Sequence, residues 1–584
     1  MKANIFFTLF FIFFGCAKKL QTIDIEVSSR DLLLEHIQIL SDDKMEGRYP
    51  GSNGSKKSVD YIVKNFKNAG LRPVNGKSYL QYFDFTKGIK LGNNNNLNIM
   101  NLPIAVGTDY MPLEFSSSGS YKGTAVFVGY GFKIDSLNWN DYEAIDIKNK
   151  WAIIIRNSPE PDNPHSKFYN HSSLRKKASL AKDMGALGVI FVNRYENNDL
   201  LELSFDQNSK AMGIPVIHLS SEAVQEILKI DIELIRSDID KKFESNSFFI
   251  NAEISSNIDL AKEQVQVPNI IGLIPGNDKR LRNEYIVIGA HFDHLGYGGI
   301  GSGSLAKNIK EIHNGADDNA SGTAALIELS RLLSSKIKLN RSIIFIAFNA
   351  EEQGLLGSKY FVENPTVDIS KIISMVNLDM IGRMRDNKLS IGGVGTSKRF
   401  NDLIDSINKN YNLDITKNSS GLGPSDHSSF YNKKIPVLFF FTGSHQEYHR
   451  PADDWQKINI KGEEAIIKFV NDLVGGIDKN DSRPEFLSTD NDNSNNTRTS
   501  FSVTFGIMPS YGNNDYGLKV DGVRENGPAF KAGMKTGDII ININKKNVSD
   551  IYEYMIRLGE LSPGDKAGVE VLRNGETILL QIQL

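Results

Sequence analysis

The sequence predicts an α/β protein whose main sheet is mostly parallel and is covered by helices. The first observation is that apolar runs typical of buried strands alternate with stretches of helical period between residues 255 and 477. The second is that short strands interrupt this pattern at residues 110–254 and return after residue 498. Because 584 residues are too many for one core, we expect several domains, two of them small and rich in β-strands.

The charge balance of the chain argues against one class of partner. Lysine and arginine number 67, aspartate and glutamate number 70, and the formal net charge is −3 at pH 7. A near-neutral chain lacks the basic surface expected of a nucleic-acid-binding protein. We therefore expect no nucleic-acid partner.

The first sixteen residues, MKANIFFTLFFIFFGC, resemble an export signal. The apolar run is too short for a membrane-spanning helix, which needs about 20 residues. It ends at Cys16, the only cysteine of the chain, and resembles the lipid-attachment site of bacterial lipoproteins, although Phe13 replaces the usual leucine. We predict a signal peptide at 1–16, lipidation of Cys16 and a membrane-anchored protein of the cell envelope, periplasmic or on the surface. A plain signal peptide is the alternative.

Residues 28–109 are predicted to form the first part of the α/β domain. Two amphipathic helical stretches flank the glycine-rich turn EGRYPGSNGS and are expected to cover the outside of the sheet. Residues 110–254 then contain strands such as KWAIIIRN and ALGVIFVN with one helix between them. This second segment shows no cluster of catalytic side chains.

Polar residues follow several strands of the segment 255–477. The strands are YIVIGAHFDH, SIIFIAFNAEE, KIISMVNLDM and IPVLFFFTG, and one further pair of aspartates precedes the helix ASGTAALIELSRLLSS. The polar residues in question are His291, Asp317, Asp318, Glu351, Glu352, Asp379 and His449. Because the carboxyl ends of parallel strands meet at one edge of a sheet, we expect these side chains to converge there.

This set of side chains predicts a metal centre. Histidine and carboxylate ligands without a thiolate suit zinc. Without a cation, so many carboxylates would raise one another's pKa values and destabilise the fold. Two ions about 3.5–4 Å apart can share a bridging carboxylate and hold a hydroxide that attacks a carbonyl group. A further carboxylate is then needed as general base, which gives the adjacent glutamates different roles.

Six motifs occur in the order of a known family. HFDHLG, NGADDNASGTAAL, AEEQGLLGS, NLDMIGR, GPSDHSSF and EYHRPADDW resemble the motif series of the co-catalytic two-zinc aminopeptidases, a family that includes glutamate carboxypeptidase. With EGRYPGSNGS, the resemblance covers most of residues 28–477. It implies two Zn²⁺ ions and the removal of N-terminal residues from peptides.

The resemblance also implies a role for each matching residue. The implied metal ligands are His291, Asp318, Glu352, Asp379 and His449. Asp318 would bridge both ions and would be followed by a cis peptide bond. Glu351 is implied as the general base, and Tyr448 as a group that stabilises the tetrahedral intermediate. The Asp293 carboxylate is expected to orient the His291 imidazole without binding the metal itself.

Two other segments resemble small modules. Residues 110–254 resemble a protease-associated (PA) domain, through Gly-Tyr-Gly at 129–131 and the helix leading into GALGVIFVN. Residues 498–584 resemble a PDZ domain, through GPAFKAGMKTGDII, after a polar and flexible linker at 478–497. Peptide C-termini would dock by strand addition at the strand and loop formed by Phe505, Gly506, Ile507 and Met508. The PA domain is expected to act as a lid or gate for the substrate, with a passive spacer as the alternative. For the PDZ domain the alternative is a stabilising module without a ligand.

Three rival functions stay open. A glutaminyl cyclase-like enzyme shares the implied fold but uses one zinc ion. A carboxypeptidase would need arginines that hold a substrate carboxylate, and Arg383, Arg385 and Arg450 are available. A catalytically inactive peptide-binding protein is the third, and the intact ligand positions argue against it.

Other histidines and a glycine-rich loop crowd the same region. His294, His313, His427 and His445 do not occupy the ligand positions of the family. We expect His445 in a pocket wall, and His427 either at the cleft or as a simple packing residue. The loop GYGGIGSGSLAKNIKEI, residues 296–312, is predicted to be mobile over the site. It lacks the Gly-Lys-Ser/Thr ending of a phosphate-binding loop.

Overall fold

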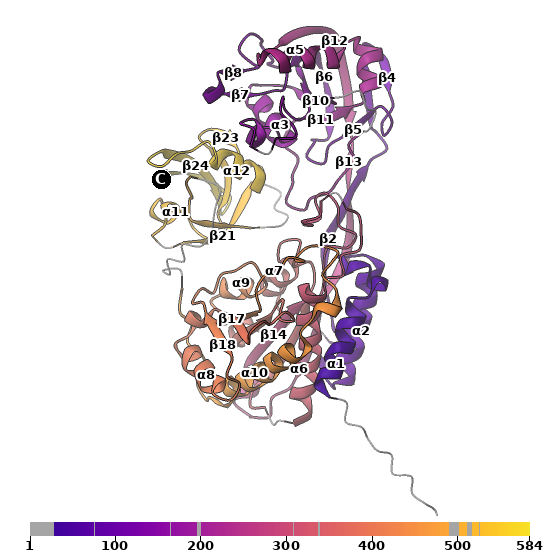
Figure 1. Ribbon diagram of the computed structural model, residues 1–584. Coiled ribbons are helices and arrows are strands. Elements are labelled where there is room, and N and C mark those ends of the chain that lie inside the picture. The colour runs from indigo at the N-terminus through magenta and orange to yellow at the C-terminus, as the bar shows by residue number, and fades with distance from the viewer. Residues whose placement is uncertain are drawn as a thin grey trace, which may run out of the picture.

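The computed structural model describes residues 28–584 except 75, 164, 195–199, 308, 337–338, 490–501, 511–516 and 525. The predicted signal peptide and the lipidation of Cys16 lie outside these residues. The described chain forms a large α/β domain, a second domain and a C-terminal domain (Figure 1). Among the described residues, none of the helices combines the length and the apolar character that a membrane span requires.

The large domain contains a nine-stranded sheet in the order β1-β13-β15-β14-β16-β19-β17-β18, with β2 also paired to β13. The strands are β1 (Arg72–Pro73), β2 (Leu80–Leu91), β13 (Leu260–Ile274), β14 (Tyr285–His291), β15 (Ser342–Phe348), β16 (Ile372–Leu378), β17 (Lys388–Gly392), β18 (Asp414–Lys417) and β19 (Val437–Phe441). The four central strands, β15, β14, β16 and β19, are parallel. Every residue of β15 and β16 is buried, as expected for strands covered on both faces.

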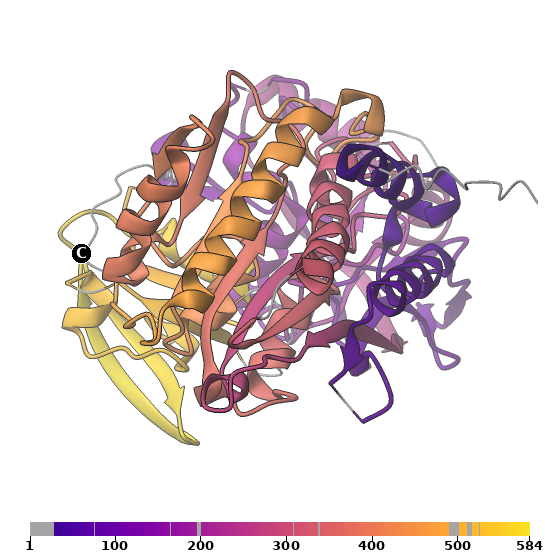
Figure 2. The same cartoon turned by 90° about the horizontal axis from the view of Figure 1, so that it is seen from below.

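Helices cover both faces of this sheet. One face carries α1 (Ser29–Leu40), α2 (Asn53–Asn68), α6 (Gly322–Lys336), α8 (Lys398–Asn408) and α10 (Ile460–Lys479) (Figure 2), and the other carries α7 (Leu356–Glu363) and α9 (His427–Tyr431). Strand β14 contacts the helices on both faces of the sheet. Ile286 and Ile288 belong to the core beneath α1, α2, α6, α8 and α10, whereas Val287 belongs to the core that contains Phe361 of α7. The predicted α/β class with a mostly parallel sheet is confirmed.

The second domain contains an eight-stranded sheet in the order β4-β3-β12-β6-β9-β10-β11-β5. Its strands are β3 (Asn96–Ile99), β4 (Leu102–Ile104), β5 (Tyr110–Pro112), β6 (Gly119–Val128), β9 (Trp151–Ile155), β10 (Gly188–Val192), β11 (Val216–Leu219) and β12 (Ser247–Ile258). The domain therefore starts before residue 110, the predicted boundary. The reason is that β3 pairs with β12 and buries Leu97 and Ile99 in the core of this sheet.

A long two-stranded ribbon joins these domains. Strands β2 and β13 run antiparallel from the pair Leu80–Ile270 in the large domain to the pair Leu91–Leu260 at the second domain (Figure 1). The ribbon thus continues the main sheet outward and carries the inserted domain at its end.

The C-terminal domain lies between the other two, on the side away from this ribbon (Figure 1). Its sheet has the order β20-β21-β22-β24-β25 with β23 beside β22, formed by β20 (Ile507–Pro509), β21 (Leu518–Val523), β22 (Ile539–Ile543), β23 (Lys546–Asn547), β24 (Lys566–Arg573) and β25 (Glu576–Gln583). Its helices are α11 (Pro528–Lys531) and α12 (Ile551–Leu558).

Buried charges join the C-terminal domain to α3 (Leu174–Asp183) of the second domain. Arg557 on α12 contacts Asp183 at 2.7 Å and Glu553 at 3.0 Å. Asp550, which caps the start of α12, pairs with Arg175. We call these five residues the interdomain cluster.

The predicted linker at 478–497 is partly attached to the large domain. Helix α10 continues to Lys479, Arg483 donates to Glu284 at 2.9 Å, and the Leu487 N–H donates to the Thr396 carbonyl at 2.8 Å. Phe486 packs against Tyr431. Residues 483–489 of the predicted linker therefore contact the large domain, whereas residues 490–497 lie outside the described residues.

Candidate active site

Four strand ends and the start of one helix bring the predicted residues together. His291 ends β14, Glu351 and Glu352 follow β15, and Asp379 follows β16. The other contributors are Asp318, just before α6, and His449, in the segment after β19. These side chains are largely buried, and His449 is the most exposed of them at 13%.

Asp318 lies between two pairs of side chains. Its Oδ1 is 3.5 Å from His291 Nε2, and Asp379 Oδ1 is 3.4 Å from the same nitrogen. Its Oδ2 is 3.1 Å from His449 Nε2, and Glu352 Oε2 is 3.0 Å from that nitrogen. Each oxygen of one carboxylate thus faces its own pair of one histidine and one further carboxylate. The peptide bond after Asp318 is cis, as the resemblance implies.

The donor set of this cluster fits zinc. His449 Nε2 is buried and makes no hydrogen bond among the described residues, although it faces two carboxylates. Burial lowers the pKa of His449, but Glu352 and Asp318 outweigh burial and raise that pKa to about 11. Imidazole nitrogens and carboxylate oxygens that converge without a thiolate match the ligands of catalytic zinc sites. Two triads have ligand atoms within 4.8 Å of one another: His291–Glu351–Asp379 and His294–Asp318–Glu352.

The two adjacent glutamates have different surroundings. Burial raises the pKa of Glu351 well above its ordinary value, even though His291 opposes that shift. Burial would also raise the pKa of Glu352, but His449 and His294 hold it well below its ordinary value. Glu352 is therefore suited to remain ionised, whereas Glu351 is suited to accept a proton.

Asp293 supports the glutamates more directly than it supports His291. Its Oδ1 accepts the N–H of Glu351 at 3.0 Å, and its Oδ2 accepts that of Glu352 at 3.4 Å. The carboxylate lies 3.8 Å from His291 Nδ1, which instead faces the Asp293 carbonyl oxygen at 3.3 Å. The main-chain carbonyl of Asp293 therefore orients His291. The carboxylate of Asp293 instead holds the turn that carries the two glutamates.

The glycine-rich loop and Tyr448 position His449. Gly303 accepts a hydrogen bond from His449 Nδ1 at 3.0 Å, and the Leu305 N–H donates to the His449 carbonyl at 3.0 Å. The Tyr448 ring stacks on the His449 ring with centroids 3.8 Å apart. Burial and the nearby charge of Asp318 raise the pKa of Tyr448 above its ordinary value, so its hydroxyl stays protonated.

Sequence reasoning missed three supporting residues. Arg48 is buried and donates to the carbonyl oxygens of Phe292 at 2.7 Å and Gly315 at 2.9 Å. His294 Nδ1 lies 2.6 Å from Glu352 Oε1, and Ser425 donates to Asp379 Oδ2 at 2.7 Å. Arg48 and Ser425 stand in quoted motifs, EGRYPGSNGS and GPSDHSSF, but their partners are distant in sequence.

Several expected neighbours lie outside the cluster. Asp317 accepts the Gly382 N–H at 2.7 Å and lies 3.3 Å from His445. The His427 ring stacks on Phe439 at 4.4 Å, which makes it a packing residue. His313 is within 2.8 Å of the Ser304 hydroxyl in the glycine-rich loop.

Comparison with known proteins identifies three modules. Residues 269–474 match peptidase family M28, residues 121–227 match the PA domain, and residues 503–584 match the PDZ domain. The chain carries a peptidase family M28 domain. We therefore call the three bodies the peptidase, PA and PDZ domains, and their predicted presence and order are confirmed.

The chain is similar to several named proteins. It is 25% identical over 323 residues to Aminopeptidase YwaD of Bacillus subtilis, covering 53% of this chain and 62% of that protein. It is 31% identical over 195 residues to Leupeptin-inactivating enzyme 1 of Streptomyces exfoliatus, covering 32% and 38%. The chain thus spans less than two thirds of either relative. The solved structure of BSAP, a zinc aminopeptidase from Bacillus subtilis, is 21% identical with a TM-score of 0.47, covering 76% of this chain and 94% of that one.

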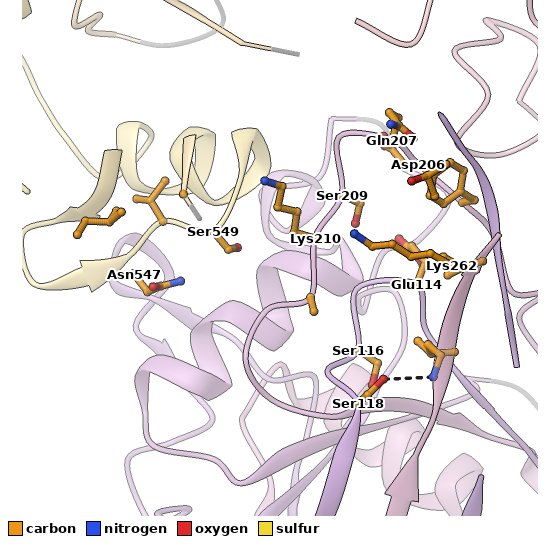
Figure 3. Close-up of a pocket in the computed structure, with 18 residues that line it drawn as sticks. Glu114, Ser116, Ser118, Asp206, Gln207, Ser209, Lys210, Lys262, Asn547 and Ser549 are labelled. Carbon is orange, nitrogen blue, oxygen red and sulfur yellow. Dashed lines mark hydrogen bonds between the residues drawn. The ribbon is translucent and has the colours of Figure 1, made fainter. Parts of the chain in front are cut away.

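A cavity of about 640 Å³ lies between the PA and PDZ domains, beside the ribbon of β2 and β13 (Figure 3). Its lining includes Glu114 and Lys210 from the PA domain, Lys262 from β13, and Asn547 and Ser549 from the PDZ domain. The residues of the candidate metal cluster are not part of this lining. The cavity is therefore separate from the candidate active site.

Proposed function

We propose that this protein is a zinc-dependent aminopeptidase that removes N-terminal residues from peptides. The observation that carries the proposal is the position of Asp318 between two histidine–carboxylate pairs, beside a second glutamate suited to accept a proton. Matches to family M28 and to proteins named aminopeptidases support it.

We infer that the ligands of this chain would hold two zinc ions. His291 and Asp379 would serve the ion on the Oδ1 side of Asp318. Glu352 and His449 would serve the ion on the Oδ2 side. Bound zinc would polarise the scissile carbonyl and lower the pKa of the attacking water. The hydrogen bond from His294 to Glu352 suggests that His294 orients this ligand rather than binding the metal itself.

Side chains of this protein would move the protons of the reaction. The Glu351 carboxylate would take a proton from the attacking water and pass it to the leaving amine. The Tyr448 hydroxyl, which stays protonated, would donate a hydrogen bond to the oxygen that gains negative charge. Arg48 and Asp293 would hold the main chain that carries His291, Asp318 and the two glutamates.

One observation weighs against a carboxypeptidase. Arg383 contacts Glu447 at 3.0 Å and lies 3.8 Å from Asp453, so internal carboxylates already engage its guanidinium. Arg385 and Arg450 are exposed. A substrate carboxylate would have to compete with Glu447 for Arg383, the arginine of the three that is not exposed.

The PDZ domain is proposed to bind peptide C-termini at β20. This strand is at the edge of its sheet, which strand addition requires. Ile507 and Met508 belong to β20 and Gly506 precedes it. Phe505 is fully buried and packs against Tyr554, so it would contribute only its main chain.

We also propose that the protein is exported and held at a membrane by a lipid on Cys16. The support is the sequence MKANIFFTLFFIFFGC, with its single cysteine at the end of the apolar run. Labelled fatty acid should enter the wild-type protein and not Cys16→Ser. Equal labelling of both would contradict the proposal.

A peptide panel tests the proposed activity. Peptides free or acetylated at the N-terminus, and free or amidated at the C-terminus, are incubated with the zinc-loaded protein. We expect cleavage that needs the free amine, stops with chelator and is absent in Glu351→Gln. Cleavage that needs the free carboxylate would indicate a carboxypeptidase. Cyclisation of N-terminal glutamine with one zinc ion bound would indicate a glutaminyl cyclase-like enzyme, and peptide binding without turnover would indicate an inactive binding protein.

A further inference from the structure

The cavity between the PA and PDZ domains, which we call the PA–PDZ cavity, is lined by groups that both domains hold in place (Figure 3). The Lys210 N–H donates to Asp550 Oδ2 at 2.8 Å, and the Tyr552 hydroxyl donates to the Asp206 carboxylate. Lys210 and Asp206 line the cavity from the PA side, whereas Asp550 and Tyr552 belong to the PDZ domain. Hydrogen bonds between the two domains therefore fix one wall of the cavity.

Two buried polar atoms at this cavity have no hydrogen-bond partner among the described residues. They are Gln207 Oε1 of the PA domain and Ser549 Oγ of the PDZ domain. Gln207 is only 5% exposed. Because a buried polar group without a partner is costly, such groups in a cavity wall indicate where a ligand would form hydrogen bonds.

Two charged side chains at the cavity, Glu114 and Lys262, have no ion-pair partner within the part of the chain that the structure describes. Glu114 is half-buried, and its carboxylate accepts a hydrogen bond from the Ser204 hydroxyl at 3.3 Å. Burial raises the pKa of Glu114, which indicates that water solvates this carboxylate poorly. Lys262 on β13 is exposed, and its amino group extends toward the PDZ side of the cavity (Figure 3). The wall thus offers a ligand one charge of each sign.

The rest of the lining adds an apolar wall. It consists of Ile89, Phe205, Leu260, Ile541 and Val548. With a volume of about 640 Å³, the cavity is within the usual range for small-ligand sites, about 300–1,000 Å³. Glu114 would repel a simple anion, and Lys262 would repel a simple cation. A small molecule that carries both charges and an apolar group would fit the whole lining.

We propose that the PA–PDZ cavity binds a free amino acid with an apolar side chain. The α-ammonium group would contact Glu114 and Gln207, the carboxylate would contact Lys262, and the side chain would lie against the apolar wall. The cavity is separate from the candidate active site, so the inference goes beyond the proposed function and does not depend on it. Because the ligand would touch residues of both domains, its binding would stabilise the contact between them.

Hydrogen exchange followed by mass spectrometry tests this site in the zinc-loaded full chain. Protection of segments 205–211 and 547–549 is measured against the concentration of leucine, which gives a Kd for these segments and separates them from the candidate active site. Isocaproate, which lacks the ammonium group, and isoamylamine, which lacks the carboxylate, are the matched ligands. The variants are Glu114→Gln and Lys262→Met, and melting temperatures check that each is folded. Lys133→Met, which removes an exposed lysine elsewhere in the PA domain, is the control.

We expect leucine to slow exchange in both segments, and each variant to weaken leucine binding about tenfold, because one charge-assisted contact is lost. Glu114→Gln should not weaken the binding of isocaproate, and Lys262→Met should not weaken that of isoamylamine. The Lys133→Met control should bind leucine as the wild type does. Protection confined to other segments, or equal leucine binding by the wild type and both variants, would overturn the inference. Protection of these segments by phosphate at the same concentrations would also overturn it, because it would indicate a site for simple anions.

Discussion

The protein buries two charge clusters that differ in how their charges are balanced. In the interdomain cluster each carboxylate contacts an arginine: Asp183 and Glu553 contact Arg557, and Asp550 contacts Arg175. In the candidate metal cluster, the ion-pair contacts found among the described residues for Asp318, Glu351, Glu352 and Asp379 are all with histidines. In the first cluster every carboxylate has an arginine partner from the chain itself. The second cluster has more carboxylates than basic side chains.

This difference separates a structural joint from a binding site. Buried charges are tolerated when each is paired and hydrogen-bonded, and they are costly when one partner is missing. The balanced cluster needs no ligand and can hold two domains together. The unbalanced cluster is explained only if cations complete it, so the missing countercharge indicates where function resides.

The largest expected effect comes from Glu351→Gln. Loss of a general base lowers the rate by about 100- to 10,000-fold, so kcat should fall within that range. Zinc content measured by elemental analysis should not change, because the proposed ligands are intact. Loss of zinc together with activity would instead make Glu351 a ligand, in line with its place in a triad with His291 and Asp379.

Asp318→Asn should weaken zinc binding, because Asp318 contacts both histidine–carboxylate pairs. Outer-sphere partners of a metal ligand typically contribute about 10- to 100-fold in affinity, and we expect a ligand shared by two ions to contribute more. Titration with zinc against a competing chelator measures this affinity. Equal zinc affinity in the wild type and Asp318→Asn would contradict the assignment of Asp318 as a shared ligand.

Arg557→Met should destabilise the protein without affecting zinc. It removes the arginine partner of Asp183 and leaves Glu553, which is 1% exposed, buried without its arginine. Leaving one charge of a buried pair without its partner costs about 3–5 kcal/mol. The free energy of unfolding of the full chain, measured by denaturant titration, checks this. Adding Asp183→Leu and Glu553→Leu should restore most of the loss, and failure to restore it would show that charge balance is not what stabilises this joint.

Lys359→Ala should have the smallest effect. Lys359 pairs with Asp521 at 2.9 Å where the peptidase domain meets the PDZ domain, and its side chain is 22% exposed. Pairs near the surface contribute at most about 1 kcal/mol and weaken in salt. If Lys359→Ala lowered the free energy of unfolding at high salt as much as Arg557→Met does, the Lys359–Asp521 pair would behave like the buried pairs of the interdomain cluster.

The sequence was sufficient to predict the main sheet and to predict that the metal-site residues converge at one of its edges. Apolar runs such as SIIFIAFNA predict buried strands, and the ends of parallel strands meet at one edge, so Glu351 and Asp379 could be placed from order alone. Arg48 could not be assigned, because its partners are backbone carbonyls that any sequence provides.

The contacts between domains were beyond sequence reasoning for a different reason. Arg557 and Asp183 are 374 residues apart and each resembles an ordinary surface charge on an amphipathic helix. The same holds for Phe486 in the predicted linker, which looks like a stray apolar residue until its partner Tyr431 is known. Such pairs follow no local periodicity and can be recognised only in the folded structure.

The most direct test of the charge-balance account is the number of zinc ions bound per chain, measured by elemental analysis after loading and removal of free metal. The account predicts two ions in the wild type, two in Arg557→Met, and fewer in Asp318→Asn. Binding of no zinc, or equal binding by the wild type and Asp318→Asn, would contradict the claim that the unbalanced cluster is the metal site.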